Sequence, residues 1–228
     1  SEEAHGPFQT WSLDNFPLQN GSVLAQAYIA WHSVGTLNSA GDNAILVPSW
    51  YSGTHRILED VYVGKGRALD PDRYFIVLVN QLGNGLSSSP SNTAYPQSGA
   101  CFPTLSIADD VTAQYRLLTE KLGVKELALV TGGSMGAQQT YEWAVRYPDF
   151  VRRIAPIAGT AKSTAHGRLH TQTLIDAIIS DPAWQGGNYR DSADVRQGLE
   201  RHARLFALWG WGPKFLNKAR FKDLEFPT

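Results

Sequence analysis

The chain has 228 residues, a formal net charge of −1, 43% hydrophobic residues and 18% charged residues. This composition predicts a folded chain and argues against a nucleic-acid-binding protein, which needs a clustered excess of Lys and Arg. No apolar run approaches the roughly 18 residues of a membrane span, and the acidic N-terminus is unlike a signal peptide. The one cysteine, Cys101, cannot form an internal disulfide. We therefore expect a cytoplasmic protein.

Apolar runs of strand and helix character alternate along the first 160 residues. Strands are predicted by apolar or alternating runs over residues 23–34, 43–48, 74–80, 127–131 and 154–158. Helical spacing predicts helices over residues 107–118 and 137–147. Ser106 and Asp109 form a variant capping box before the first helix, and Pro148 ends the second. The alternation indicates a parallel, three-layer α/β sheet.

The character of the sequence changes after Thr160. No strand is predicted there, and helical spacing recurs over residues 174–179, 195–208 and 214–221. We therefore predict two parts, a core at residues 1–160 and a helical insertion at residues 161–228.

The motif Gly132-x-Ser134-x-Gly136 stands between a predicted strand and a predicted helix. A nucleophilic serine in such a motif stands on a strained strand-to-helix turn, so the residues two positions away must be small. The helix N-terminus below it offers N–H groups to a developing oxyanion. The alternative is a Gly-rich turn where a strand packs closely on a helix, but the flanking elements favour Ser134 as a nucleophile.

Residues 132–136, with Glu142-Trp143 and Tyr147-Pro148, resemble the homoserine O-acetyltransferase family of α/β-hydrolases. The similarity runs in register from about residue 27 to the C-terminus, so it extends beyond a single motif. Further matching stretches are residues 64–74, 80–83, 102–103, 107, 110 and 181–189.

This resemblance implies an α/β-hydrolase fold, with a mostly parallel central sheet, helices on both faces and residues 161–228 as a helical cap. It also implies an acyl group carried on Ser134 and passed to a hydroxyl acceptor. A cephalosporin-type acetyltransferase or esterase branch of the family fits as well. The acyl donor is an ester or a thioester such as acyl-CoA, and no permanently bound cofactor and no metal are expected.

Two backbone N–H groups form the oxyanion hole of this fold. Matched residue by residue to the family, the donors fall at Met135 and Trp50. The Trp50 indole then walls the acyl pocket beside Tyr51, or else it is a core residue that caps the sheet edge.

Two positions depart from the family pattern. The Arg that holds the homoserine carboxylate is replaced by Ile175, which offers no bidentate clamp. Nearby Arg168 or Arg190 are the available substitutes, and we expect an acceptor other than homoserine. The expected pocket residues are therefore Tyr51, Ile175 and Arg168. The Gly that follows the motif in the family is Ala137 here.

A nucleophilic serine needs a histidine base oriented by an acid, and in this fold both follow the serine in the sequence. The three later histidines, His166, His170 and His202, lie in predicted helical segments and are more typical of surface or capping residues. We therefore expect the acid, the histidine and the last strands outside this sequence. Truncation, a missing trailing part, or cleavage into a second chain of the same precursor each fits.

Two classes of function follow. The first is a serine acyl-transfer enzyme that acts on a small-molecule ester or thioester, with water or a hydroxyl compound as acceptor. The second is a non-catalytic α/β-hydrolase-like binding or scaffold protein, which has no need of a strained serine turn. Either class is compatible with a homodimer.

Overall fold

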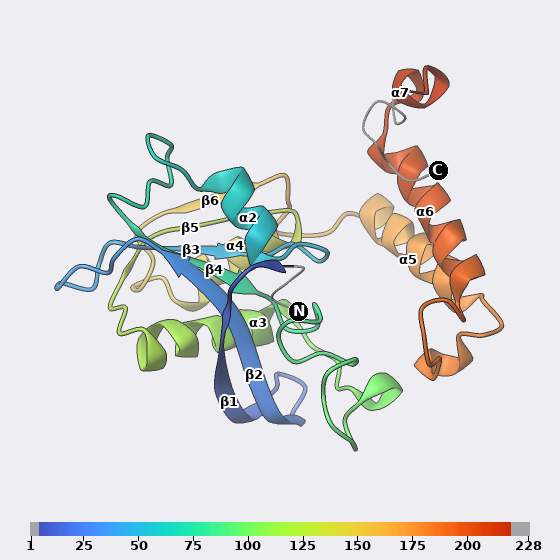
Figure 1. Ribbon diagram of the computed structural model, residues 1–228, viewed down its shortest axis with the longest axis horizontal. Coiled ribbons are helices and arrows are strands. Elements are labelled where there is room, and N and C mark those ends of the chain that lie inside the picture. The colour runs from blue at the N-terminus through green and yellow to red at the C-terminus, as the bar shows by residue number, and fades with distance from the viewer. Residues whose placement is uncertain (1–4, 220–228) are drawn as a thin grey trace. The chain divides into compact units, whose positions relative to one another are not determined.

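The computed structural model describes residues 5–219 (Figure 1), and the chain divides into two compact units, Ser1–Lys162 and Ser163–Thr228. The first unit holds all the strands of the described residues. The second is helical. No helix within residues 5–219 is long and apolar enough to cross a membrane.

The first unit is built on one six-stranded sheet of order β1-β2-β4-β3-β5-β6. Pairs β1–β2 and β2–β4 are antiparallel, whereas β4–β3, β3–β5 and β5–β6 are parallel. The predicted mostly parallel sheet is thus confirmed, with all five predicted strands present. The strands are β1 Gln9–Pro17, β2 Val23–Val34, β3 Ala44–Pro48, β4 Phe75–Asn80, β5 Leu127–Gly133 and β6 Ile154–Ile157.

Helices cover both faces of this sheet, as predicted. Successive side chains of a strand point to opposite faces, so Leu46 joins the core beneath α3 (Ile107–Arg116) and α4 (Met135–Arg146). Its neighbour Ile45 instead packs with Leu58 of α2 (His55–Tyr62). Figure 1 shows α2 and α3 on opposite sides of the sheet. Burial on both faces explains why β3 and β4 are continuous apolar runs.

The strand β1 was not predicted from the sequence. Only Leu13 and Phe16 of this edge strand are buried, so its hydrophobic pattern is weak. The pairing with β2 is also irregular on either side of Asp14, whose φ of 52° interrupts the extended backbone.

The helix ends explain why α3 and α4 were predicted. Ser106 accepts from the Asp109 N–H, and the Asp109 carboxylate accepts from the Ser106 N–H at 2.7 Å, so the predicted capping box is confirmed. A π-helical turn, Leu117–Lys121, continues α3. α4 ends before Pro148, although it begins at Met135 rather than 137.

The long loop after β4 completes the hydrogen bonding of β2. Ser87 Oγ accepts from the Ala30 N–H at 2.8 Å and donates to the Asn80 carbonyl at 2.6 Å. Ser88 Oγ accepts from the Tyr28 N–H at 2.9 Å. These buried serines replace a neighbouring strand where β4 has already ended.

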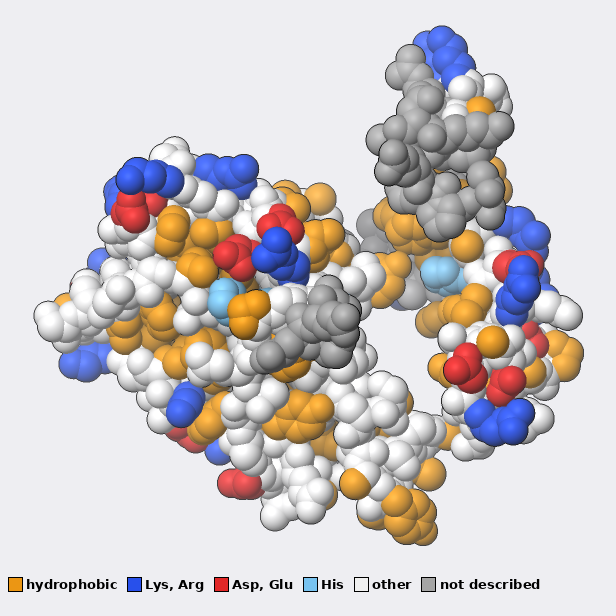
Figure 2. All heavy atoms as spheres, viewed as in Figure 1, with side chains coloured by type: hydrophobic (Ala, Val, Ile, Leu, Met, Phe, Trp, Pro, Cys, Tyr) orange, Lys and Arg blue, Asp and Glu red, His pale blue; other side chains and the backbone are white. Residues whose placement is uncertain are grey.

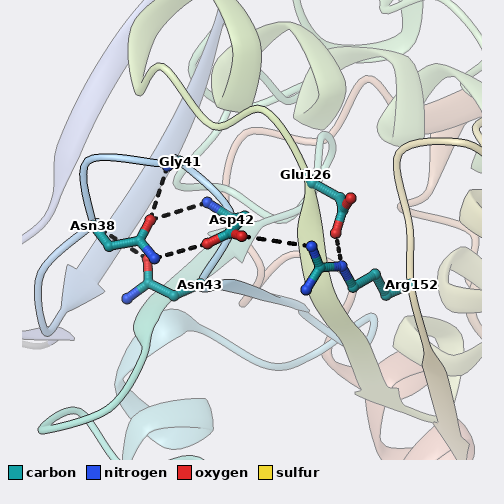
Figure 3. Close-up of polar contacts among 6 residues, drawn as sticks. All are labelled: Asn38, Gly41, Asp42, Asn43, Glu126 and Arg152. Atoms are coloured by element: carbon teal, nitrogen blue, oxygen red, sulfur yellow. Dashed lines mark hydrogen bonds and ion pairs between the residues drawn. The ribbon is translucent and has the colours of Figure 1, made fainter.

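A polar cluster joins the amino ends of β3 and β5 (Figure 3). Asp42, just before β3, pairs with Arg152 at 3.5 Å, and Arg152 also pairs with Glu126, just before β5. Asn38 closes the loop by accepting from the Gly41 N–H at 2.8 Å. In a parallel sheet all the amino ends of the strands lie on one side and all the carboxyl ends on the other. This cluster therefore holds together the amino ends of the strands, on the side away from the serine motif.

The second unit contains α5 (Ala165–Ile179), α6 (Arg196–Gly210) and α7 (Pro213–Asn217). α5 packs on α6, where a Cβ at Gly198 would come within 2.7 Å of the Ile178 carbonyl oxygen. Leu169, Leu208 and Trp209 are exposed by 60% or more, and hydrophobic side chains are visible on this unit in Figure 2. α5 begins well before the predicted residue 174, and part of the predicted segment 214–221 lies outside the described residues.

Candidate active site

Ser134 stands at the turn from β5 into α4 in a strained conformation. Its φ of 54° and ψ of −117° lie outside the regions that L-residues normally occupy. The Ser134 N–H donates to the Ile157 carbonyl of β6 at 3.0 Å, which helps hold the turn. Ser134 is exposed to solvent. A serine on such a turn presents its hydroxyl above the sheet, where a substrate can reach it.

The glycines around Ser134 are required by space. A Cβ at Gly132 would lie 2.8 Å from the Gly136 carbonyl carbon, and a Cβ at Gly136 would lie 2.5 Å from the Pro48 carbonyl oxygen. At Gly159 a Cβ would lie 2.4 Å from the Ala137 Cβ. The motif therefore brings β5, α4 and the end of β3 into backbone contact, and Ala137 fills space that Gly159 leaves open.

The two predicted oxyanion donors lie on segments that meet beside Ser134. Met135 is the first residue of α4, so its N–H has no acceptor within the helix. Trp50 follows β3, which pairs in parallel with β5, so the carboxyl ends of both strands lie at the same edge. The Trp50 indole lies against Gly53 and, more loosely, Gly133, and it packs on the edge of the core cluster around Ile45.

The buried carboxyl group of Asp110 contacts the backbone just after the carboxyl end of β4. The sequence did not single this group out as functional. Asp110 is 2% exposed and accepts from the Leu82 N–H at 2.7 Å. Burial raises the pKa of Asp110 to about 8, the Asp109 charge adds to the rise, and the Leu82 N–H opposes it. Asp110 therefore secures the start of the loop that follows β4.

His55, the first residue of α2, is a second buried polar residue and follows the loop at residues 49–54 that contains Trp50. Its ring nitrogen Nδ1 lies 3.1 Å from Asn80 Nδ2, and its backbone N–H donates to Asn80 Oδ1 at 3.0 Å. Burial lowers the pKa of His55. These bonds attach the start of α2 to the end of β4.

The other predicted pocket residues are divided between the two units. Tyr51 directly follows Trp50 in the loop between β3 and α2 and is 54% exposed. Ile175 and Arg168 lie on α5 of the second unit, and Arg168 donates to the Ser163 carbonyl at 2.8 Å. Arg190, the other possible clamp, is exposed and pairs with Asp194.

The three later histidines all lie on helices of the second unit. His166 and His170 are on α5, where His170 packs on Trp209 with ring centroids 4.8 Å apart. His202 is on α6 and packs near Phe206. Within residues 5–219 no group of three His, Cys, Asp or Glu side chains is placed to hold a metal ion.

A strained serine between the fifth strand and the following helix, on a sheet of order β1-β2-β4-β3-β5-β6, defines an α/β-hydrolase. Residues 59–225 match the alpha/beta hydrolase fold family. The chain therefore belongs to this family, as the sequence predicted.

The particular relatives include both hydrolases and acyltransferases. The chain is 55% identical to the ethyl acetate hydrolase of Pseudomonas veronii, over 100% of this chain and 65% of the relative. It is 39% identical to the homoserine O-acetyltransferase of Trichormus variabilis, over 85% of this chain and 55% of the relative. The predicted resemblance to the acetyltransferases is thus confirmed, and the esterase branch is represented.

Solved structures agree with this assignment. The acetyl esterase MekB superimposes with a TM-score of 0.94 and 54% identity, over 100% of this chain and 66% of that chain. This chain therefore spans just under two thirds of the length of these relatives.

Proposed function

We propose that this chain carries the nucleophile and the oxyanion hole of an ester hydrolase that works through an acyl-serine intermediate. The observation that carries the proposal is the conformation of Ser134, with φ 54° and ψ −117° on an exposed turn at the N-terminus of α4. A turn with only a structural role would not need a non-glycine residue at this positive φ. The backbone strain at Ser134 is offset by the close packing at Gly132 and Gly136.

In the first half-reaction, Ser134 Oγ attacks the carbonyl carbon of the ester while its proton passes to a histidine base. The carbonyl oxygen becomes negative and accepts hydrogen bonds from the N–H groups of Met135 and Trp50. Collapse of this intermediate breaks the bond to the alcohol oxygen. The alcohol leaves with the proton, and the acyl group stays on Ser134.

In the second half-reaction, water attacks the acyl carbon and gives a proton to the same base. The bond to Ser134 Oγ breaks, the carboxylic acid leaves, and the serine recovers its proton. A hydroxyl compound in place of water makes the reaction an acyl transfer rather than a hydrolysis.

The base and its acid partner are proposed to lie outside these 228 residues, on a trailing segment or on a second chain of the same precursor. Two observations support this. The histidines after Ser134 lie on helices of the second unit. Among the described residues β6 pairs with β5 alone, and its Ile154 and Ile157 are exposed, so a further strand has a free edge to join.

The proposed substrate is a small ester with a short acyl group. The names of the relatives support this, because they include an ethyl acetate hydrolase and an acetyl esterase. In the sequence match to the acetyltransferase family, the position of the Arg that holds the homoserine carboxylate is Ile175, which favours a substrate or acceptor other than homoserine. Acyl transfer from acyl-CoA is the second candidate, supported by the acetyltransferase relative.

The first test is labelling of the full protein with a fluorophosphonate probe. The second measures its reaction with p-nitrophenyl acetate, ethyl acetate and acetyl-CoA, each substrate with and without homoserine. We expect labelling of Ser134 and hydrolysis of the esters. The Ser134→Ala variant should lose labelling and at least about 1,000-fold in kcat, because a triad stripped of its nucleophile retains little activity.

The matched control is Ser192→Ala, an exposed serine of the second unit that should behave as the parent. An unlabelled Ser134, or a Ser134→Ala variant as active as the parent, would exclude the proposal and favour the binding or scaffold protein. Acetylation of homoserine faster than ester hydrolysis would favour the acyltransferase.

A further inference from the structure

A chain of hydrogen bonds runs through the core between α3 and α4. The Trp143 indole Nε1–H donates to Gln114 Oε1 at 2.8 Å, and Gln114 Nε2 donates to Gln139 Oε1 at 2.5 Å. All three side chains are fully buried. Burying an amide side chain is costly unless it is hydrogen-bonded, and here the hydrogen bonds offset that cost. Packing alone does not explain why two glutamines occupy core positions.

The direction of the chain is fixed by its first member. An indole N–H can only donate, so Gln114 must present its oxygen to Trp143 and its NH₂ group to Gln139. Gln139 must then present its oxygen to Gln114, which turns its own NH₂ group toward β3. The two amides cannot reverse without leaving the buried Trp143 N–H facing another donor.

The chain ends on the carbonyl oxygen of Ser49. Gln139 Nε2 donates to this oxygen at 3.0 Å, and Ser49 is fully buried. The peptide unit that begins with this carbonyl continues with the Trp50 N–H. Because a trans peptide is planar, its C=O and N–H point in opposite directions. With its carbonyl held toward Gln139, the peptide directs the Trp50 N–H away from the buried amides.

A branch of the same network reaches the second oxyanion donor. Gln139 Nε2 also donates to Gln81 Oε1 at 3.0 Å, and Gln81 Nε2 donates to the Met135 sulfur at 3.4 Å. The Gln81 backbone N–H donates to Ser49 Oγ at 3.1 Å. The side chain of Gln139 thus connects the segments that carry both donors.

We propose that Gln139 is a positioning residue that holds the Ser49–Trp50 peptide in the orientation in which the Trp50 N–H can bind the oxyanion on Ser134. This inference rests on the proposed function, since it assigns a task to that oxyanion hole. With the Gln139 donor removed, the peptide loses the bond that fixes its carbonyl, and a rotated peptide presents an oxygen rather than an N–H to the oxyanion.

The test compares Gln139→Met with the parent in the full protein. Met has similar length but donates no hydrogen bond. We expect kcat for p-nitrophenyl acetate to fall about 100-fold, the loss typical of one oxyanion donor. KM should stay within about twofold of the parent, because the ground-state ester makes little use of this donor. The rate of Ser134 labelling by the fluorophosphonate should fall with kcat.

The control is Gln138→Met, the preceding residue of the same helix, whose side chain makes none of these hydrogen bonds. It should retain the kcat, KM and labelling rate of the parent. Thermal unfolding of the variants shows whether each is folded.

The variant Gln139→Glu separates positioning from a structural role. A protonated Glu can donate to the Ser49 carbonyl, whereas a carboxylate cannot. Its kcat divided by that of the parent should therefore rise as the pH falls, while the same ratio for Gln139→Met stays flat. This readout also decides the question if the Met variant does not fold.

A folded Gln139→Met variant with the kcat of the parent would overturn the inference, and so would a change confined to KM. A pH-independent ratio for Gln139→Glu would overturn it as well. In each of these cases the parent is still labelled at Ser134 and the proposed function stands. A parent that is not labelled removes both.

Discussion

The two units of the chain differ in how completely they bury their own apolar side chains. In the first unit the sheet and its helices fully enclose Phe16 and Trp143. Within residues 163–219, by contrast, the only buried hydrophobic side chains are Ala177 and Val195, and Leu208 is 72% exposed. The first unit thus encloses its core except along the open β6 edge, and the second unit exposes several of its large apolar side chains.

This difference explains where strained and buried polar groups are found. A serine at positive φ and a network of buried amides are stable only where the surrounding structure fixes their conformation and satisfies their hydrogen bonds. The first unit supplies such surroundings through backbone contacts among β3, β5 and α4. Within residues 163–219 a comparable contact is found at Gly198, between α5 and α6.

The largest effect expected from this comparison is that of adding a methyl group to a glycine in each unit. In Gly136→Ala the new Cβ would meet the Pro48 carbonyl oxygen at 2.5 Å, whereas at Gly212 nothing lies within 4 Å. We expect Gly136→Ala to lower the free energy of unfolding by about 3 kcal/mol, as overpacking does. Gly212→Ala should leave it unchanged. Urea unfolding of both variants checks this, and equal midpoints would contradict a tightly packed motif.

A second prediction concerns the buried carboxyl of the first unit. Burial raises the pKa of Asp110 to about 8 in the folded protein, above its ordinary value of 3.8. The folded state therefore binds the proton more tightly, and the stability from this group is lost as the pH rises from about 4 through about 8. The loss is about 1 kcal/mol per pH unit within this range.

Asp110→Asn keeps the acceptor for the Leu82 N–H without an ionisable group. Urea unfolding at pH 6 and pH 8 should show a smaller loss of stability in this variant than in the parent. The exposed Asp149→Asn serves as the control. If the Asp110→Asn and parent proteins lost the same stability between the two pH values, the raised pKa would be wrong.

The smallest effect is expected at Asp181 of the second unit, and its pH dependence has the opposite direction. Backbone N–H groups of Ala183 and Gly198 lower the pKa of Asp181 below its ordinary value of 3.8. Its contribution is present above that value and is lost as the pH falls below it.

Hydrogen exchange in α5 and α6 at pH 7 and pH 3, corrected for intrinsic rates, measures this contribution. Acid should increase exchange in the parent more than in Asp181→Asn, while β3 and β5 stay protected in both. Equal acid sensitivity in the two proteins would show that Asp181 does not stabilise the helix pair.

The sequence predicted the elements whose own residues determine them. The strands β3 to β6 are apolar runs, and α3 has its own capping box at Ser106. The serine motif was equally readable, because the spacing of Gly132 and Gly136 around Ser134 follows from local geometry.

What the sequence did not predict depends on contacts between distant segments. α2 has eight residues, and its N-cap Thr54 makes no side-chain hydrogen bond, so no local signal marks its start. The buried amides are ordinary polar residues until the fold brings Gln114 and Gln139 together. Their only signal in the sequence is glutamine at helix positions that face the core.

The hydrogen bond from Gln81 to Met135 has a practical consequence, because Met135 is the only methionine among the 228 residues. A ¹³C label on methionine methyl groups would give one NMR signal from these 228 residues, located one residue from Ser134. Peroxide would likewise have one thioether to oxidise among these residues, and it belongs to Met135, whose N–H is proposed to bind the oxyanion. The chain therefore carries a built-in spectroscopic reporter at the place where its chemistry is proposed to occur.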